Sequence, residues 1–210
     1  MNKNNISYNR VKQSLIKNNC WESIQKYKNE QPLVPIFYEG LNPDGSVNSD
    51  EVNLFNDLCV LIDVVRERVI NVFICTTEPG WKFRKNPLSS DGWAMIDFGY
   101  QRCWKIGSHI TKTSNQNPCL IQTGSSIKVW RNKSPNGNRK TGKLFIGWFG
   151  INIHTTNNDD VDYDVSIING WSAGCLVFYN AFEFYNDFMS KLTKLKCDLF
   201  GCVVLPESEY

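Results

Sequence analysis

The chain of 210 residues has little net charge and no long apolar run. Its formal charge of +2 is too small to indicate a nucleic-acid partner, and no basic stripe runs beside the aromatic residues. No apolar stretch approaches the length that crosses a bilayer, so we expect no membrane insertion. The first residues lack the apolar core of a signal peptide, so we expect synthesis in the cytoplasm without the usual export route.

The cysteines are numerous, but none of them form a C-x-x-C pair. This spacing does not support a zinc ribbon or a thioredoxin-like motif. In a protein without an export signal, we expect most of the eight cysteines to be buried free thiols rather than disulfides. Histidine is scarce, so the base for any reactive thiol must be His109 or His154.

Residues 1–35 differ from the rest of the chain in charge and periodicity. Val11, Leu15 and Ile16 keep helical spacing, and Trp21 and Ile24 continue it, so we predict one or two short helices. The local excess of lysine and arginine is typical of a solvated helix face rather than a polyanion site. Proline at 32 and 35 ends the pattern, and we predict a helical N-terminal segment at 1–35 and a catalytic domain at 36–210.

The second segment is rich in predicted strands. Residues 58–65 are apolar and suit either a strand or a buried helix. We predict strands at 70–76, 92–97, 103–106, 120–123, 127–131, 144–154 and 199–205. Apolar residues between 178 and 195 recur at helical spacing and predict a C-terminal amphipathic helix. The fold class expected from this order is α+β.

Cys175 has the surroundings of a nucleophile. It follows the small residues Ser172-Ala173-Gly174, and His154 ends an apolar run upstream. A catalytic thiol needs a base, N–H groups aimed at the developing oxyanion, and room for a carbonyl carbon. His154 meets the first need, and a tight turn at Gly174 meets the other two. The alternative reading is a structural cysteine and a histidine satisfied elsewhere.

The stretch from His154 to Cys175 resembles the catalytic block of the L,D-transpeptidase (YkuD-type) family. That block has a histidine at a strand end, a loop, and then Ser/Thr-His-Gly-Cys. A closer resemblance is to an uncharacterised bacterial and phage subgroup with Ser-Ala-Gly-Cys at the nucleophile. It covers roughly residues 70–205 and includes the blocks at 76–80, 86–88, 104–109, 122–124, 129–131, 147–154 and 171–175. Two positions depart from the family pattern: Ala173 replaces the second histidine, and Val177 replaces an arginine or asparagine.

The resemblance implies a sheet-dominated domain, of β-sandwich or mixed-sheet type, and a role for each motif residue. Cys175 would be the nucleophile, His154 the base and Gly174 part of the oxyanion site. The residues expected to contact substrate are Ser172, His109, Trp171 and Thr155. For His109 a hydrogen bond in the core is an equal alternative. The crowded acidic residues Asp159, Asp160, Asp162 and Asp164 are expected to form a solvated loop rather than a cation site.

The implied substrate is a peptidoglycan stem peptide, and the implied reaction needs no metal or organic cofactor. The enzyme would form a thioester and act as an L,D-transpeptidase or as an L,D-carboxypeptidase or endopeptidase. The alternative is a non-catalytic structural or wall-binding virion protein. A phage-encoded enzyme, released to the wall by lysis or carried in the virion, would reconcile a wall substrate with the missing export signal. The sequence does not indicate the oligomeric state.

Overall fold

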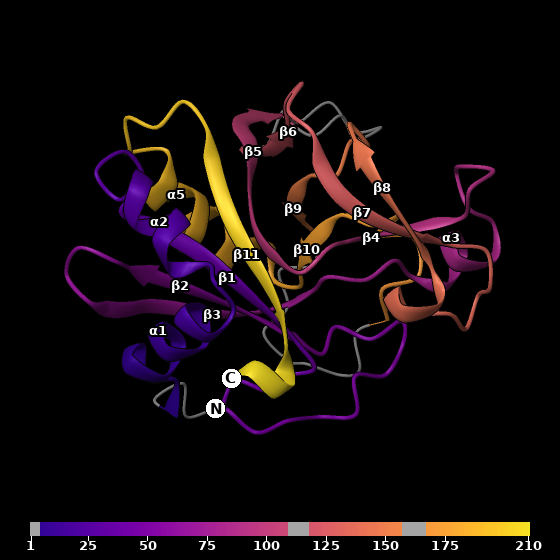
Figure 1. Ribbon diagram of the computed structural model, residues 1–210, viewed down its shortest axis with the longest axis horizontal. Helices are drawn as coiled ribbons and strands as arrows, with labels where there is room; N and C mark the ends of the chain where they lie inside the picture. The colour runs from indigo at the N-terminus through magenta and orange to yellow at the C-terminus, as the bar shows by residue number, and fades with distance from the viewer. Residues whose placement is uncertain (1–4, 109–117, 157–166) are drawn as a thin grey trace.

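The computed structural model describes residues 5–108, 118–156 and 167–210, and the fold is dominated by sheet (Figure 1). A closed barrel contains the strands β1 (Leu33–Glu39), β2 (Asp57–Asp63), β3 (Arg68–Thr76), β5 (Gly99–Ser108), β6 (Pro118–Gln122), β9 (Ile153–Thr155), β10 (Leu176–Phe178) and β11 (Phe200–Pro206). Their order around the barrel is β1-β11-β5-β6-β9-β10-β3-β2. The pairs β1–β11 and β9–β10 are parallel, and the other neighbours are antiparallel.

A separate three-stranded antiparallel sheet lies beside the barrel, at the right of Figure 1. It has the order β4-β7-β8, from β4 (Trp93–Ile96), β7 (Ile127–Asn132) and β8 (Lys143–Gly147). The short helix α3 (Trp81–Lys85) lies at the same side, and the 3₁₀ turn η2 (Arg139–Thr141) precedes β8. This sheet matters for the site because one wall of the pocket described below comes from it.

The N-terminal segment forms the two predicted helices, α1 (Tyr8–Lys17) and α2 (Trp21–Tyr27). Near the other end a helix runs through α4 (Ala181–Glu183), the π-helical η3 (Phe184–Met189) and α5 (Ser190–Leu192), and η4 (Glu207–Glu209) follows β11. The C-terminal helix is therefore confirmed. It starts later than predicted, because Phe178 belongs to β10 and Asn180 caps the helix by accepting the N–H of Glu183 at 2.9 Å.

Two apolar cores explain why β2 is buried along its whole length. Cys59 and Leu61 belong to the main core, which also holds Phe184 and Phe188 of the C-terminal helix. The alternate residues of β2 (Leu58, Val60, Ile62) face a second core against Val11, Leu15 and Ile24 of α1 and α2. A strand covered on both faces reads as a continuous apolar run. That explains why its sequence suited a helix as well as a strand.

The architecture corrects the expected β-sandwich. The mixed sheet closes on itself, because β1 pairs with both β2 and β11 and because Leu120 of β6 pairs with Ile153 of β9. The predicted strand at 144–154 is also divided into β8 and β9, since the chain turns at Gly150 with a φ of +70°. Pro35 lies inside β1, just before pairing with β11 begins at Ile36.

Among the described residues, no helix is both long and apolar enough to cross a membrane.

Candidate functional site

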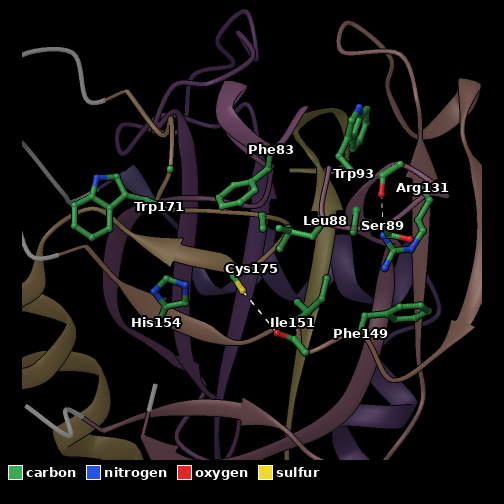
Figure 2. Close-up of a pocket in the computed structure, with 16 residues that line it drawn as sticks. Phe83, Leu88, Ser89, Trp93, Arg131, Phe149, Ile151, His154, Trp171 and Cys175 are labelled. Atoms are coloured by element: carbon green, nitrogen blue, oxygen red, sulfur yellow. Dashed lines mark hydrogen bonds between the residues drawn. The ribbon is translucent and has the colours of Figure 1, made fainter. Parts of the chain in front are cut away.

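Cys175 and His154 line one pocket, of about 450 Å³, between the barrel and the small sheet (Figure 2). The wall is about equally polar and apolar, and its large apolar side chains are Phe83, Leu88, Trp93, Phe149, Ile151 and Trp171. The polar side chains of the lining are Ser89, Arg131, His154 and Cys175. A cleft that combines large apolar side chains with a few converging polar groups suits a small-molecule or peptide ligand.

The strand register places Cys175 and His154 on the same face of the sheet. Leu176 of β10 pairs with Ile153 of β9, and both point into the main core. Because side chains alternate along a strand, Cys175 and His154 both point to the opposite face. Cys175 directly precedes β10, so the two residues lie diagonally across the parallel β9–β10 pair. Figure 2 shows both side chains in the pocket.

The turn before Cys175 is held in a single shape. The Ser172 hydroxyl donates to the Cys175 carbonyl at 2.8 Å and accepts the N–H of Gly174 at 3.1 Å. Gly174 has a φ of +130°, and a Cβ there would lie 2.6 Å from the Ala94 carbonyl oxygen of β4. Only glycine fits this position without strain. The small sheet thus packs directly against the turn at 172–175.

The Cys175 sulfur is held by the backbone of the chain before β9. It accepts the N–H of Asn152 at 3.4 Å, and its thiol faces the carbonyl of Gly150 at 3.9 Å. Burial raises the pKa of the Cys175 thiol to about 11, against the opposing effect of the Asn152 N–H. At neutral pH the resting group is therefore a thiol, and attack on a carbonyl needs a base.

His154 is buried and has the tautomer that a base requires. Its Nδ1 lies 3.1 Å from the backbone carbonyl of Thr155. A carbonyl oxygen only accepts, so Nδ1 is the donor in this contact, and in the neutral ring the lone pair lies on Nε2. In this form the imidazole can take a proton from a thiol through Nε2.

The predicted oxyanion donors differ in availability. The N–H of Gly174 is occupied by the Ser172 hydroxyl. Within the described residues, the N–H of Cys175 makes no hydrogen bond. Gly174 therefore shapes the turn, and the Cys175 N–H is the better candidate for stabilising an oxyanion.

The segment at 78–80, which the sequence analysis did not assign to the site, supports the turn at 172–175. The N–H of Gly80 donates to the Ser172 carbonyl at 3.0 Å, and a Cβ on Gly80 would lie 2.3 Å from the Asn169 carbonyl oxygen. Two residues earlier, Glu78 forms a buried ion pair with Arg84 at 3.0 Å. The guanidinium of Arg84 also stacks over the Trp93 ring at 4.3 Å. These contacts link the turn, α3 and the small sheet.

The chain matches no known family model, curated protein or solved structure. The L,D-transpeptidase resemblance therefore stays a prediction, and the geometry of the pocket carries the functional argument.

Arg131 of β7 lies in the matched block at 129–131, but the sequence analysis gave it no role in the site. It is the one lysine or arginine in the lining, and the described lining contains no aspartate or glutamate. Its Nη1 donates to the Gly92 carbonyl at 2.8 Å, and its guanidinium lies 5.2 Å from the centre of the Phe149 ring. Burial lowers the pKa of Arg131, and the charge of Asp91 opposes this effect. Only the tertiary fold reveals that this cation faces the pocket.

The other predicted site residues take different places. Trp171 lines the pocket and is 41% exposed. Ser172 and Thr155 are buried outside the lining, and the Thr155 hydroxyl donates to the Phe178 carbonyl at 3.1 Å. His109 lies outside the described residues, as do Asp159, Asp160, Asp162 and Asp164. In the described part of the chain, no group of three or more His, Cys, Asp or Glu side chains is arranged to hold a metal ion.

Proposed function

We propose that the protein is a cysteine acyltransferase or peptidase of the L,D-transpeptidase type. The observation that carries the proposal is that Cys175, directly before β10, and His154 of β9 lie on one face of the sheet and line one pocket. A thiol, an imidazole that donates through Nδ1, and an N–H at Cys175 that makes no hydrogen bond within the described residues are the groups that acyl transfer needs.

The reaction follows from these groups. As the sulfur of Cys175 bonds to the substrate carbonyl carbon, His154 takes the thiol proton, and the Cys175 N–H stabilises the oxyanion. The carbon–nitrogen bond then breaks, and the proton passes from His154 to the leaving amine. An acceptor amine or water attacks the thioester and gives its proton to His154. That proton returns to the sulfur as the carbon–sulfur bond breaks.

The proposed substrate is a peptidoglycan stem peptide, cleaved between an L- and a D-configured centre. The support for this substrate is the motif resemblance, with Ala173 as its main departure, and a pocket of a size suited to a few residues of peptide. The proposal includes delivery to the wall by phage lysis or within a virion.

A second candidate is a non-catalytic wall-binding or virion module. The raised pKa of the Cys175 thiol favours it, because a thiol with a pKa of about 11 is a poor nucleophile without help. The two candidates differ in what His154 does, since only the enzyme needs it as a base.

The deciding experiment is incubation with purified sacculi, followed by mass spectrometry of the muropeptides. The enzyme predicts new cross-links or shortened stems, which disappear in Cys175→Ala. The control variant is Cys197→Ala, because Cys197 is a partly exposed free thiol outside the pocket. Unchanged muropeptides from folded protein with a reduced Cys175 would contradict the proposal.

A further inference from the structure

Arg131 presents a positive charge in the pocket, and the charge of Asp91, which lies outside the lining, acts on it without forming a salt bridge among the described residues. Within the described residues it forms no salt bridge, and its one hydrogen bond is from Nη1 to the Gly92 carbonyl. The guanidinium has five N–H donors, so most of them are left for a ligand. The buried arginines Arg139 and Arg84 differ from Arg131, since they pair with Glu39 and Glu78 respectively.

The surroundings of Arg131 suit one anionic group of a ligand. The ring of Phe149 covers one part of the guanidinium and Gly92 holds Nη1, so its position is fixed before a ligand arrives. No acidic side chain of the described lining competes for it. A charge that has lost part of its hydration gains more from an anion than a fully solvated charge does.

The position of Arg131 relative to the Cys175 sulfur indicates which part of the substrate would carry the anionic group. Figure 2 shows Cys175 between the imidazole of His154 and the guanidinium of Arg131, with Ile151 and Leu88 along the apolar path. A peptide with its scissile carbonyl at Cys175 would therefore present a different part of its chain to each side. The leaving residue is the nearest part that can carry a carboxylate.

We propose that Arg131 binds the free C-terminal carboxylate of the leaving residue, so the site selects peptides whose terminal residue is removed. This inference rests on the proposed function and sharpens it. The first half-reaction would release a terminal amino acid, whereas cleavage within a longer chain would be disfavoured. A bidentate guanidinium–carboxylate pair gives this selectivity, because an amide cannot replace the lost charge.

The test compares a short peptide ending in L-lysyl-D-alanine with its C-terminal amide. Both are titrated against Cys175→Ala by NMR, so that no turnover is needed. We expect the carboxylate form to bind roughly 10- to 100-fold more tightly, the range for a hydrogen bond to a charged group. Adding Arg131→Met should remove that difference, and adding Arg131→Lys should keep part of it.

The matched control is Lys128→Gln, which removes the same charge from the same strand but outside this pocket. It should leave the carboxylate preference unchanged. Equal binding of the two peptides, binding of neither, or a preference that survives Arg131→Met would overturn the inference. If Arg131→Met does not fold, Arg131→Lys and the wild-type preference still decide the question.

Turnover separates this inference from the proposed function. If wild-type protein forms a thioester at Cys175 from both peptides at equal rates, the proposal that Arg131 binds the carboxylate is wrong, and the proposed catalytic function is supported. If Cys175→Ala binds the carboxylate form selectively while wild-type protein acylates with neither peptide, Arg131 keeps its role and the catalytic proposal fails.

Discussion

The dependence of Cys175 reactivity on His154 is a quantitative prediction. With a pKa of about 11, the thiol is ionised to only about one part in ten thousand at pH 7, against about 3% for an ordinary cysteine. Without assistance, alkylation at pH 7 would therefore be several hundredfold slower than that of a free thiol. A neighbouring imidazolium lowers the pKa of such a group by about 1–3 units. We therefore expect His154→Ala to slow alkylation at pH 7 by about 10- to 1,000-fold.

The assay is iodoacetamide labelling between pH 6 and 11, with each cysteine followed by peptide mass spectrometry. The pKa of about 11 contains only the effects of burial and of the Asn152 N–H, and no effect of a charged His154. Proton transfer from Cys175 to His154 adds that effect, so the wild-type inflection should lie below 11 and His154→Ala should return it to about 11. Cys197 is the internal control, since it is partly exposed, lies outside the pocket and should label equally in both proteins. Identical profiles for Cys175 in the two proteins would refute the dyad.

Two further predictions concern the support of the site. Gly174→Ala places a Cβ 2.6 Å from the Ala94 carbonyl oxygen at a φ of +130°. Urea unfolding should therefore show a free energy of unfolding lower by at least about 2 kcal/mol. The control is Gly124→Ala, whose Cβ would meet nothing within 4 Å and which should unfold like the wild type. Burial raises the pKa of Glu78 to about 7 and that of Asp50 to about 6. A carboxyl group whose pKa is higher in the folded state stabilises the fold fully at a pH below its pKa in the unfolded state. This stabilisation is lost as the pH rises through its pKa in the folded state. The free energy of unfolding should thus fall between about pH 4.5 and 7, by on the order of 3 kcal/mol for Glu78 alone. Glu78→Gln should make the free energy of unfolding depend less on pH. A steeper dependence on pH in that variant would contradict the raised pKa of Glu78.

Local patterns in the sequence predicted most elements but not how they close. The spacing of Val11, Leu15 and Ile24 located α1 and α2, and β-branched runs located β3 and β11. The barrel depends on the pairing of β1 with β11, two strands at opposite ends of the chain. Nothing in either strand identifies its partner. The five-residue helix α3 was missed because it is too short to show an apolar period.

The same division applies to the site. The small residues before Cys175 and the position of His154 indicated a nucleophile and a base. The raised pKa of the thiol could not be predicted, since it comes from burial in the tertiary fold. The engagement of the Gly174 N–H by Ser172 and the approach of Arg131 to the pocket also depend on tertiary contacts. Sequence reasoning therefore located the proposed nucleophile and base but not Arg131, which is proposed to shape selectivity.

The most direct test of the central claim is the mass of the intact protein after brief incubation with a peptide ending in L-lysyl-D-alanine, followed by acid quenching. The account predicts an added mass equal to the acyl part of the peptide, located on Cys175 and lost on treatment with hydroxylamine. The adduct should be absent in Cys175→Ala and strongly reduced in His154→Ala. The account would be contradicted if folded protein with a reduced Cys175 gained no such mass at peptide concentrations high enough to occupy the pocket.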